Sequence, residues 1–139
     1  MSQTHATPDI TQILRDAKII AIIGASSDPG RPSNSIMAYL QRAGYKTIPV
    51  NPNETEILGE PAYKSLADIP ASTKVDIVNV FRRPAATPDV ARAAIARGDA
   101  KTLWLQTGVV NDEAMALAQG AGMNAIQNSC IAVLHRLYK

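Results

Sequence analysis

Hydrophobic residues in this chain gather into five short runs that contain few polar residues. The runs are rich in isoleucine and valine, and such unbroken apolar character is typical of strands covered on both faces of a sheet. Glycine, proline or asparagine follows each run within three residues and ends it. The pattern predicts strands at Ile19–Ile23, Lys46–Val50, Val75–Phe81, Thr102–Gln106 and Met123–Gln127.

Between the runs, apolar residues recur at intervals of three and four positions, which is the spacing of a helix with one buried face. Thr7 before Pro8 is typical of a cap followed by the first helical residue, so the first helix is expected from there to about Ala17. The other helices are expected at residues 33–43, 87–97 and 111–120, with a short terminal helix that carries Ile131, Leu134 and Leu137.

The alternation of strands and helices is interrupted at residues 54–70, which are expected to be irregular with a short turn at residues 65–68. Regular alternation favours a parallel sheet with helices on both faces, and right-handed crossovers restrict it to a doubly wound sheet. We therefore predict an α/β fold with a Rossmann-like, doubly wound parallel sheet of five strands. Its three-layer α/β/α arrangement would form one domain over residues 1–139.

The loop after the first strand is the first candidate for a binding site. The apolar run stops at Gly24, and small residues lead from there to Pro32, where a helix is expected to begin. Amide groups and the helix dipole at a helix N-terminus favour an anion, and a glycine lets a ligand approach the backbone closely. The loop therefore predicts a phosphate-bearing ligand, which Gly24→Val would block without unfolding the protein. An ordinary turn between strand and helix is the alternative.

Two common phosphate-binding loops fit this segment poorly. A P-loop would need Lys-Ser/Thr after Gly30, where the chain has Arg31-Pro32 instead. The dinucleotide fingerprint needs a second glycine soon after Gly24 and an acidic residue at the end of the second strand, which here ends at Asn51. These departures argue against P-loop ATP hydrolysis and against an NAD site, whereas NADP stays open because Arg31 can meet a 2′-phosphate.

Six short motifs occur in order at residues 24–30, 50–52, 57–63, 65–70, 80–84 and 104–109, reading GASSDPG, VNP, ILGEPAY, SLADIP, VFRRP and WLQTGV. Together they resemble the small stand-alone CoA-binding proteins, which are related to the nucleotide-binding domain of the succinyl-CoA synthetase α subunit. The resemblance covers residues 10–137. It implies a Rossmann-like domain that holds the ADP part of coenzyme A across the carboxyl ends of the strands.

The resemblance also implies which residues hold the ligand. They lie at and after the ends of the first four strands: Gly24, Ala25, Ser26 and Ser27 at the pyrophosphate, Asn51 and Pro52 beside the nucleotide, and Gln106, Thr107 and Gly108 on the adenine side. Gly30 in the first motif and Phe81 at the end of the third strand are further candidates.

Charge and loop position add Arg31, Arg82 and Arg83 as candidates for the phosphates. A guanidinium group can hold two phosphate oxygens at once, whereas an ammonium group acts as a point charge. The alternative for each is a solvated surface residue or a local ion pair. Arg83 is the weakest candidate, because adjacent residues on an extended chain point in opposite directions.

The synthetase relatives carry a second domain with a phosphorylatable histidine, and neither His5 nor His135 lies in a matching context. The resemblance therefore does not extend to ligase chemistry. In the last loop, Asn128-Ser129 precedes Cys130 where many small relatives have a basic residue before the cysteine, which leaves the role of this loop open.

Cys130 has two interpretations. It lies between the fifth strand and a predicted helix N-terminus, where a thiolate is stabilised, and the first interpretation is a mixed disulfide with the thiol of CoA. A small buried residue that fills space is the alternative, and it is the commoner role of a free cysteine. Since nothing in the sequence pairs Cys130 with a positioned base, we predict the second role.

Composition excludes several classes of protein. Charged residues make up 19% of the chain, aromatic residues 4%, and the net charge is +2, which does not support nucleic-acid binding. No apolar segment is long enough to span a membrane, and the polar N-terminus is unlike a secretory signal. One cysteine allows no internal disulfide and fits a reducing cytoplasm, and two distant histidines give no metal-ligand spacing.

We therefore predict a cytoplasmic, non-catalytic module that binds coenzyme A or an acyl-CoA. Asp28, Glu60 and Asp76 form no recognisable acid–base pair, which favours binding over turnover. The alternative is an enzyme, either NADP-dependent or acting on the CoA thiol through Cys130. Assembly as a homo-oligomer or with a larger partner subunit stays open.

Overall fold

The computed structural model describes residues 7–138, and His5 lies outside them. The expected sheet consists of β1 (Ile19–Ile23), β2 (Lys46–Val50), β5 (Ile77–Val80), β6 (Thr102–Leu105) and β7 (Asn124–Ile126). All neighbouring strands are parallel, and they lie in the order β2-β1-β5-β6-β7. Because the chain returns from β2 across β1 to β5, its winding direction reverses between β1 and β5. The Rossmann-like, doubly wound fold is thus confirmed.

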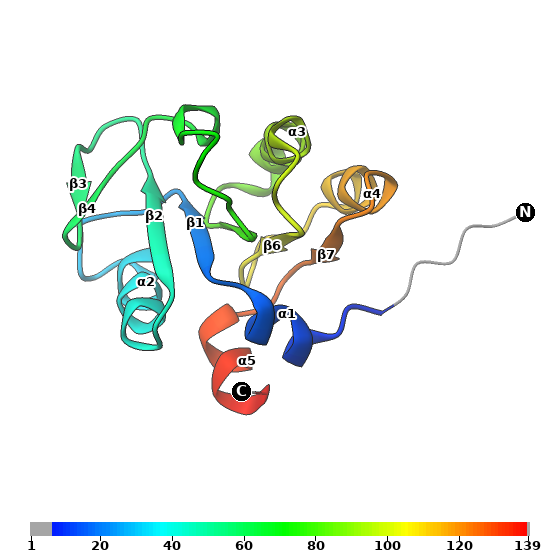
Figure 1. The fold of residues 1–139 in the computed structure, drawn as a ribbon, viewed down its shortest axis with the longest axis horizontal. Coiled ribbons are helices and arrows are strands. Elements are labelled where there is room, and N and C mark those ends of the chain that lie inside the picture. The colour runs from blue at the N-terminus through cyan, green and yellow to red at the C-terminus, as the bar shows by residue number, and fades with distance from the viewer. Residues whose placement is uncertain (1–6, 139) are drawn as a thin grey trace, which may run out of the picture.

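Helices cover both faces of this sheet (Figure 1). One face carries α3 (Thr87–Arg97) and α4 (Asp112–Gly120), and the other carries α1 (Ile10–Asp16), α2 (Pro32–Arg42) and α5 (Ile131–Tyr138). Two short 3₁₀ helices, η1 (Leu66–Asp68) and η2 (Pro84–Ala86), precede β5 and α3.

One expectation about a helix end is wrong. The N-cap of α1 is Asp9 rather than Thr7, because the carboxylate of Asp9 accepts a hydrogen bond from the Gln12 amide at 3.1 Å. Pro8 therefore precedes the helix instead of beginning it. In α5, Ile131 and Leu134 pack against the core, whereas Leu137 is 70% exposed.

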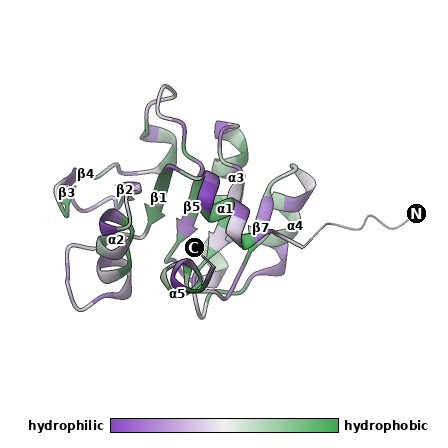
Figure 2. Ribbon diagram, turned by 60° about the horizontal axis from the view of Figure 1, so that its bottom comes forward, coloured by the Kyte–Doolittle hydropathy of each residue, from purple (hydrophilic) through white to green (hydrophobic). Residues whose placement is uncertain are grey.

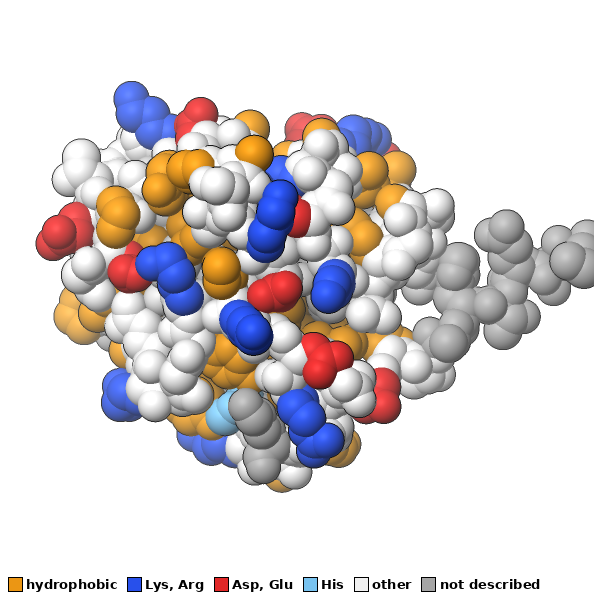
Figure 3. All heavy atoms as spheres, in the orientation of Figure 1, with side chains coloured by type: hydrophobic (Ala, Val, Ile, Leu, Met, Phe, Trp, Pro, Cys, Tyr) orange, Lys and Arg blue, Asp and Glu red, His pale blue; other side chains and the backbone are white. Residues whose placement is uncertain are grey.

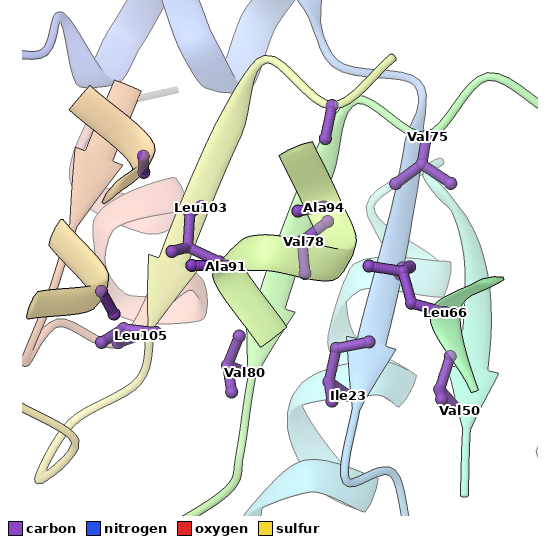
Figure 4. Packing of buried hydrophobic residues seen from close by; sticks show 14 of the residues in the cluster. Ile23, Val50, Leu66, Val75, Val78, Val80, Ala91, Ala94, Leu103 and Leu105 are labelled. Carbon is purple, nitrogen blue, oxygen red and sulfur yellow. The ribbon is translucent and has the colours of Figure 1, made fainter. Parts of the chain in front are cut away.

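The core has two layers because successive side chains of β1 point to opposite faces. Ala21 and Ile23 pack with Ala91 of α3, whereas Ile20 and Ile22 pack on the α1, α2 and α5 side. Figure 4 shows the first layer, and Figure 2 shows β1 hydrophobic along its length. Each fully buried isoleucine contributes about 1.5–3 kcal/mol, so this central strand needs apolar residues at every position.

A two-stranded hairpin stands where an irregular segment was expected. It consists of β3 (Glu56–Ile57) and β4 (Glu60–Pro61), and both turn residues have positive φ, 51° at Leu58 and 81° at Gly59. Turns of this kind usually contain Asn-Gly or Asp-Gly. Because the first turn residue here is a leucine, the sequence did not indicate a hairpin. After the hairpin, Tyr63 forms a parallel bridge with Val50 and so pairs with the outer edge of β2 at its carboxyl end.

Arg97, the last residue of α3, binds the segment that connects η1 to β5. Its guanidinium group donates hydrogen bonds to the carbonyl oxygens of Ile69 at 2.7 Å and Thr73 at 2.9 Å. It also pairs with Asp99 at 2.9 Å, and both side chains are largely buried. Asp99 in turn accepts a hydrogen bond from the Val75 amide at 3.0 Å. The pair therefore fixes an irregular stretch of backbone against the sheet.

Asp99 makes the stability of the protein depend on pH. Burial by itself raises the pKa of Asp99, but hydrogen bonds from Arg97 and the Val75 amide, with the charge of Arg97, bring it below its ordinary value. A lowered folded-state pKa means that the carboxylate stabilises the fold above the unfolded-state pKa. This contribution is lost as the pH falls through the folded-state pKa.

We expect the urea midpoint of the wild type to fall between about pH 5 and pH 2 more steeply than that of Asp99→Asn. The matched control is Asp89→Asn, whose side chain is 91% exposed in a surface ion pair. Parallel curves for the wild type and Asp99→Asn would contradict the role given to this carboxylate.

The surface carries charges of both signs. On the face drawn in Figure 3, basic and acidic side chains are interspersed, unlike the single-sign stripe of a nucleic-acid-binding surface. No helix within residues 7–138 combines the length and the apolar character needed to cross a membrane. Over the same residues, no group of three or more His, Cys, Asp or Glu side chains is arranged to hold a metal ion.

Candidate functional site

A cavity of about 820 Å³ lies at the point where the winding of the sheet reverses. Its walls come from the loops after β1, β2, β5 and β6, together with the first turn of α2 and the start of α5. Doubly wound sheets bind their ligands at this place, and the volume falls within the range of small-molecule sites.

Gly24 joins the first loop to the loop after β5. Its φ is +82°, and a Cβ atom at this position would lie 2.6 Å from the carbonyl oxygen of Phe81. The glycine is therefore needed for the approach of two backbone segments, and not to make room for a ligand. The expectation that Gly24→Val would block a ligand without affecting the fold is wrong for this reason.

Hydrogen bonds within the first loop fix its shape up to α2. The Ser26 hydroxyl accepts from the Asp28 amide at 3.0 Å, and the Asp28 carboxylate accepts from the Gly30 amide at 2.9 Å. Arg31 then occupies the N-cap position of α2 with Pro32 at the first helical position, and no side chain caps the helix. Pro32 has no N–H, and the amides of Asn34 and Ser35 donate to the Arg31 carbonyl oxygen, so within residues 7–138 the Ser33 amide is the donor of this turn that stays open to an anion.

Two of the three predicted arginines line the cavity. Arg31 approaches it from the start of α2 and Arg82 from the loop after β5. Neither forms an ion pair with a carboxylate in the described part of the chain. Arg83 is exposed at the N-cap of η2 and does not line the cavity. The cavity thus has two cations whose charge is not matched by an internal partner.

Asn51 and Glu54, from the segment after β2, form hydrogen bonds to the backbone of the first loop. The Asn51 side chain donates to the carbonyl oxygen of Ala25 at 2.8 Å and accepts from the Asn53 amide at 2.7 Å. Glu54 accepts a hydrogen bond from the Ser27 amide at 3.0 Å. The Ser27 amide is therefore engaged within the protein, and Ser27 does not belong to the cavity wall.

Gln106 lines the cavity although it is only 4% exposed. Its Oε1 accepts hydrogen bonds from the Asn79 side chain at 3.1 Å and from the Ile131 amide at 3.0 Å. A backbone amide can only donate, so these contacts fix which end of the Gln106 amide is oxygen. The remaining Nε2 donates to none of the residues 7–138, which leaves a donor for a ligand.

The sequence model of the CoA binding domain matches residues 18–136. The chain is also 40% identical over 137 residues to the uncharacterized protein YneT of Bacillus subtilis, and the match covers 99% of each chain. The chain belongs to the CoA-binding domain family.

Other members and relatives of the CoA-binding domain family differ widely in length. A hypothetical protein from Pyrococcus horikoshii has a TM-score of 0.89 and 37% identity, over 99% of each chain. Acetyl-coenzyme A synthetase 1 of Ca. Korarchaeum cryptofilum, solved with phosphate and ADP, has a TM-score of 0.74 and 26% identity. The match covers 84% of this chain but 27% of the synthetase. Acetate–CoA ligase I of Archaeoglobus fulgidus is 28% identical over 125 residues, 85% of this chain and 18% of the ligase.

Nine residues singled out from the sequence line the cavity of this CoA-binding domain: Gly24, Ala25, Ser26, Arg31, Asn51, Phe81, Arg82, Gln106 and Thr107. Five others do not: Ser27, Gly30, Pro52, Arg83 and Gly108. Gly30 and Gly108 use their amides within the protein, on Asp28 and on Asn128. Pro52 borders a second cavity of about 240 Å³, which Arg82 also lines.

Sequence reasoning missed further lining residues, among them Ser33, Ile36 and Val109, and it gave Cys130 mainly a packing role. Ile36 fits the helical spacing of α2, which predicted a core position. Such spacing cannot separate a residue that faces the core from one that faces a cavity on the same side of the helix. Asp28 and Ser33 could have been predicted as lining residues, because both are polar and lie in the loop and first helical turn that the sequence indicated as a binding site.

Proposed function

We propose that this protein binds coenzyme A or an acyl-CoA through its ADP and pyrophosphate part, as a non-catalytic binding module. The observation that carries the proposal is the pair of arginines, Arg31 and Arg82, that lines the cavity beside an uncapped helix N-terminus without internal carboxylate partners. Charge-assisted hydrogen bonds from guanidinium groups to phosphate are strong and can be bidentate. Membership of the CoA-binding domain family supports the same ligand.

The strand order supports an orientation for the ligand. β2 and β6 lie on opposite sides of the pair β1 and β5, so Asn51 and Gln106 border opposite flanks of the cavity. In doubly wound folds the residue at the end of the second strand lies beside the ribose. We therefore give the Asn51 flank to the adenosine and the Gln106 flank to the pantetheine arm, in place of the adenine contact expected from the sequence for Gln106, Thr107 and Gly108.

The chemistry of the cavity wall favours binding over turnover. Its one carboxylate, Asp28, already accepts the Gly30 amide hydrogen bond, and no histidine stands among the described lining residues. An acid–base mechanism on a CoA thioester needs a positioned group of this kind. The proposed module would thus act by carrying, sensing or presenting CoA.

Calorimetric titration with CoA, 3′-dephospho-CoA, NAD and NADP at one fixed salt concentration tests the proposal. We expect CoA to bind with micromolar affinity and to lose affinity when the 3′-phosphate is removed, because the site is built around cations. A preference for NADP would overturn the CoA module in favour of a nicotinamide-dependent protein. Absence of binding to all four compounds would reject the proposed function and leave only the fold established.

Arg82→Gln is expected to weaken CoA binding by about tenfold to a hundredfold, because hydrogen bonds to charged groups contribute about 1.5–3 kcal/mol. Arg83→Gln is the matched control, since it removes the same charge from the next residue, which is exposed like Arg82 but lies outside the cavity wall. The two variants are compared by titration in the same buffer. Equal losses of affinity would mean that the loop acts only through its net charge.

A further inference from the structure

The geometry points to Cys130 as a thiol that exchanges with the disulfide of coenzyme A, so that the protein captures one CoA as a mixed disulfide. This inference rests on the proposed function and adds a covalent state to it. Cys130 is the single cysteine of the chain, it is partly exposed, and it lines the cavity that Gly24 and Arg31 border. The thiol and the candidate phosphate ligands thus face one continuous space.

The backbone holds Cys130 in a fixed position at the start of α5. Its carbonyl oxygen accepts the amide of Leu134 at 3.0 Å, which is the first hydrogen bond of that helix. The preceding residue is fixed as well, because the indole of Trp104 donates to the carbonyl oxygen of Ser129 at 2.9 Å. The thiol therefore stands on a supported segment at the edge of the cavity, and not on a loose loop.

Gln106 is the second, independent observation that points to a ligand beside this thiol. Its Oε1 accepts the amide of Ile131, which places the side-chain amide next to Cys130 in the wall. Its Nε2 donates to no residue within the described chain, although Gln106 is more than nine-tenths buried. This donor opens onto the cavity, so a ligand bound there can supply its acceptor. The pantetheine arm carries amide carbonyl groups and ends in a thiol, so its chemistry matches both groups.

The cavity wall also offers apolar surface to the arm of CoA. Ile36, Phe81 and Val109 line the same cavity as Arg31 and Arg82. A ligand that joins phosphates through a less polar chain to a sulfur atom would use the arginines, the apolar surface and the thiol together. Among nucleotide cofactors, that description selects CoA.

The proposed step is a thiol–disulfide exchange. The Cys130 thiolate attacks one sulfur of the disulfide formed by two CoA molecules. The bond between the two CoA sulfurs breaks, and a bond forms between Sγ of Cys130 and one CoA. The other CoA leaves as a thiolate and takes up the proton that Cys130 released. Cys130 is oxidised to a disulfide and the departing CoA is reduced, so the CoA disulfide is the oxidant.

The test is intact mass spectrometry of the full chain incubated with CoA disulfide, and in parallel with the small uncharged hydroxyethyl disulfide. We expect one CoA adduct, removed by dithiothreitol and absent from Cys130→Ser. Because binding brings the two sulfurs together, the wild type is expected to react with CoA disulfide at least about tenfold faster than with the small disulfide. Arg82→Gln should slow the first reaction and leave the second unchanged.

Equal rates with the two disulfides would overturn the inference, because Cys130 would then be an ordinary accessible thiol. Absence of an adduct in protein that binds CoA by calorimetry would overturn it as well and leave the proposed function standing. Failure of both adduct formation and CoA binding would reject the two together. Titration of the wild type with CoA in the presence of dithiothreitol, where no mixed disulfide persists, separates recognition of the nucleotide from the covalent step.

Discussion

Replacement of Arg97 by methionine is expected to lower the free energy of unfolding by about 3–5 kcal/mol. The Arg97 side chain is 8% exposed, and it donates to the carbonyl oxygens of Leu66 at 3.2 Å, Ile69 at 2.7 Å and Thr73 at 2.9 Å. It also pairs with Asp99. Methionine can fill much of the same space, but it would leave these acceptors and a buried carboxylate without their donor.

Urea unfolding followed by circular dichroism measures this effect, with Arg92→Met as the control. Arg92 also belongs to α3 and also forms ion pairs, with Asp89 at 2.9 Å and Glu113 at 3.0 Å, but its side chain is 53% exposed. Exposed pairs contribute about 0–1 kcal/mol, so the control should lie close to the wild type. Similar losses for both variants would show that the buried contacts of Arg97 are not what stabilises the segment before β5.

The importance of Arg97 could not be predicted from the sequence. A basic residue in the last turn of a helix, followed by Gly98, is the ordinary way in which a helix ends. The partners that make Arg97 different are backbone carbonyls 24 to 31 positions earlier, in a segment with no periodic pattern. Every residue has a backbone carbonyl group, so the sequence does not show which of them accepts a hydrogen bond from Arg97. Contacts of this kind are seen only in the structure.

The strands were predictable because burial on both faces leaves little choice of residue. β1 and β2 have the expected bounds, whereas β5 and β7 are shorter than their apolar runs. At β5 the run begins with Val75, which is buried but lies outside the paired strand, its amide bound by Asp99. An apolar run therefore predicts which residues are buried. It predicts the bounds of a strand only where the buried residues are also the ones that pair with a neighbouring strand.

The loops at the candidate site were predictable in position but not in detail. The sequence indicates that the segments after β1, β5 and β6 meet, because parallel strands end at one edge of the sheet. It does not tell which amides are used inside the protein, as that of Ser27 is by Glu54. Nor does it tell that Arg82 faces the cavity while Arg83 does not, which depends on where the strand ends and η2 begins.

Gly24→Ala is expected to destabilise the protein by about 2–4 kcal/mol, more than Gly98→Ala, although the two glycines have nearly the same φ. A side chain in this left-handed region costs about 1–2 kcal/mol at either position. At Gly98, with φ +80°, nothing lies within 4 Å of the added Cβ, whereas at Gly24 the carbonyl oxygen of Phe81 lies 2.6 Å away. The difference between the variants therefore isolates the close approach of the two loops.

Urea unfolding of both variants gives that difference directly, and equal losses would show that the loops separate at little cost. Titration of the folded Gly24→Ala variant with CoA then measures the effect of the substitution on CoA affinity. Since the added Cβ points toward Phe81 and the side chain of Arg82 rather than into the cavity, any loss of affinity comes from displacement of the Arg82 loop. Gly24→Ala combined with Arg82→Gln should then bind CoA no more weakly than Arg82→Gln alone, because the contact that the displacement disturbs is already absent.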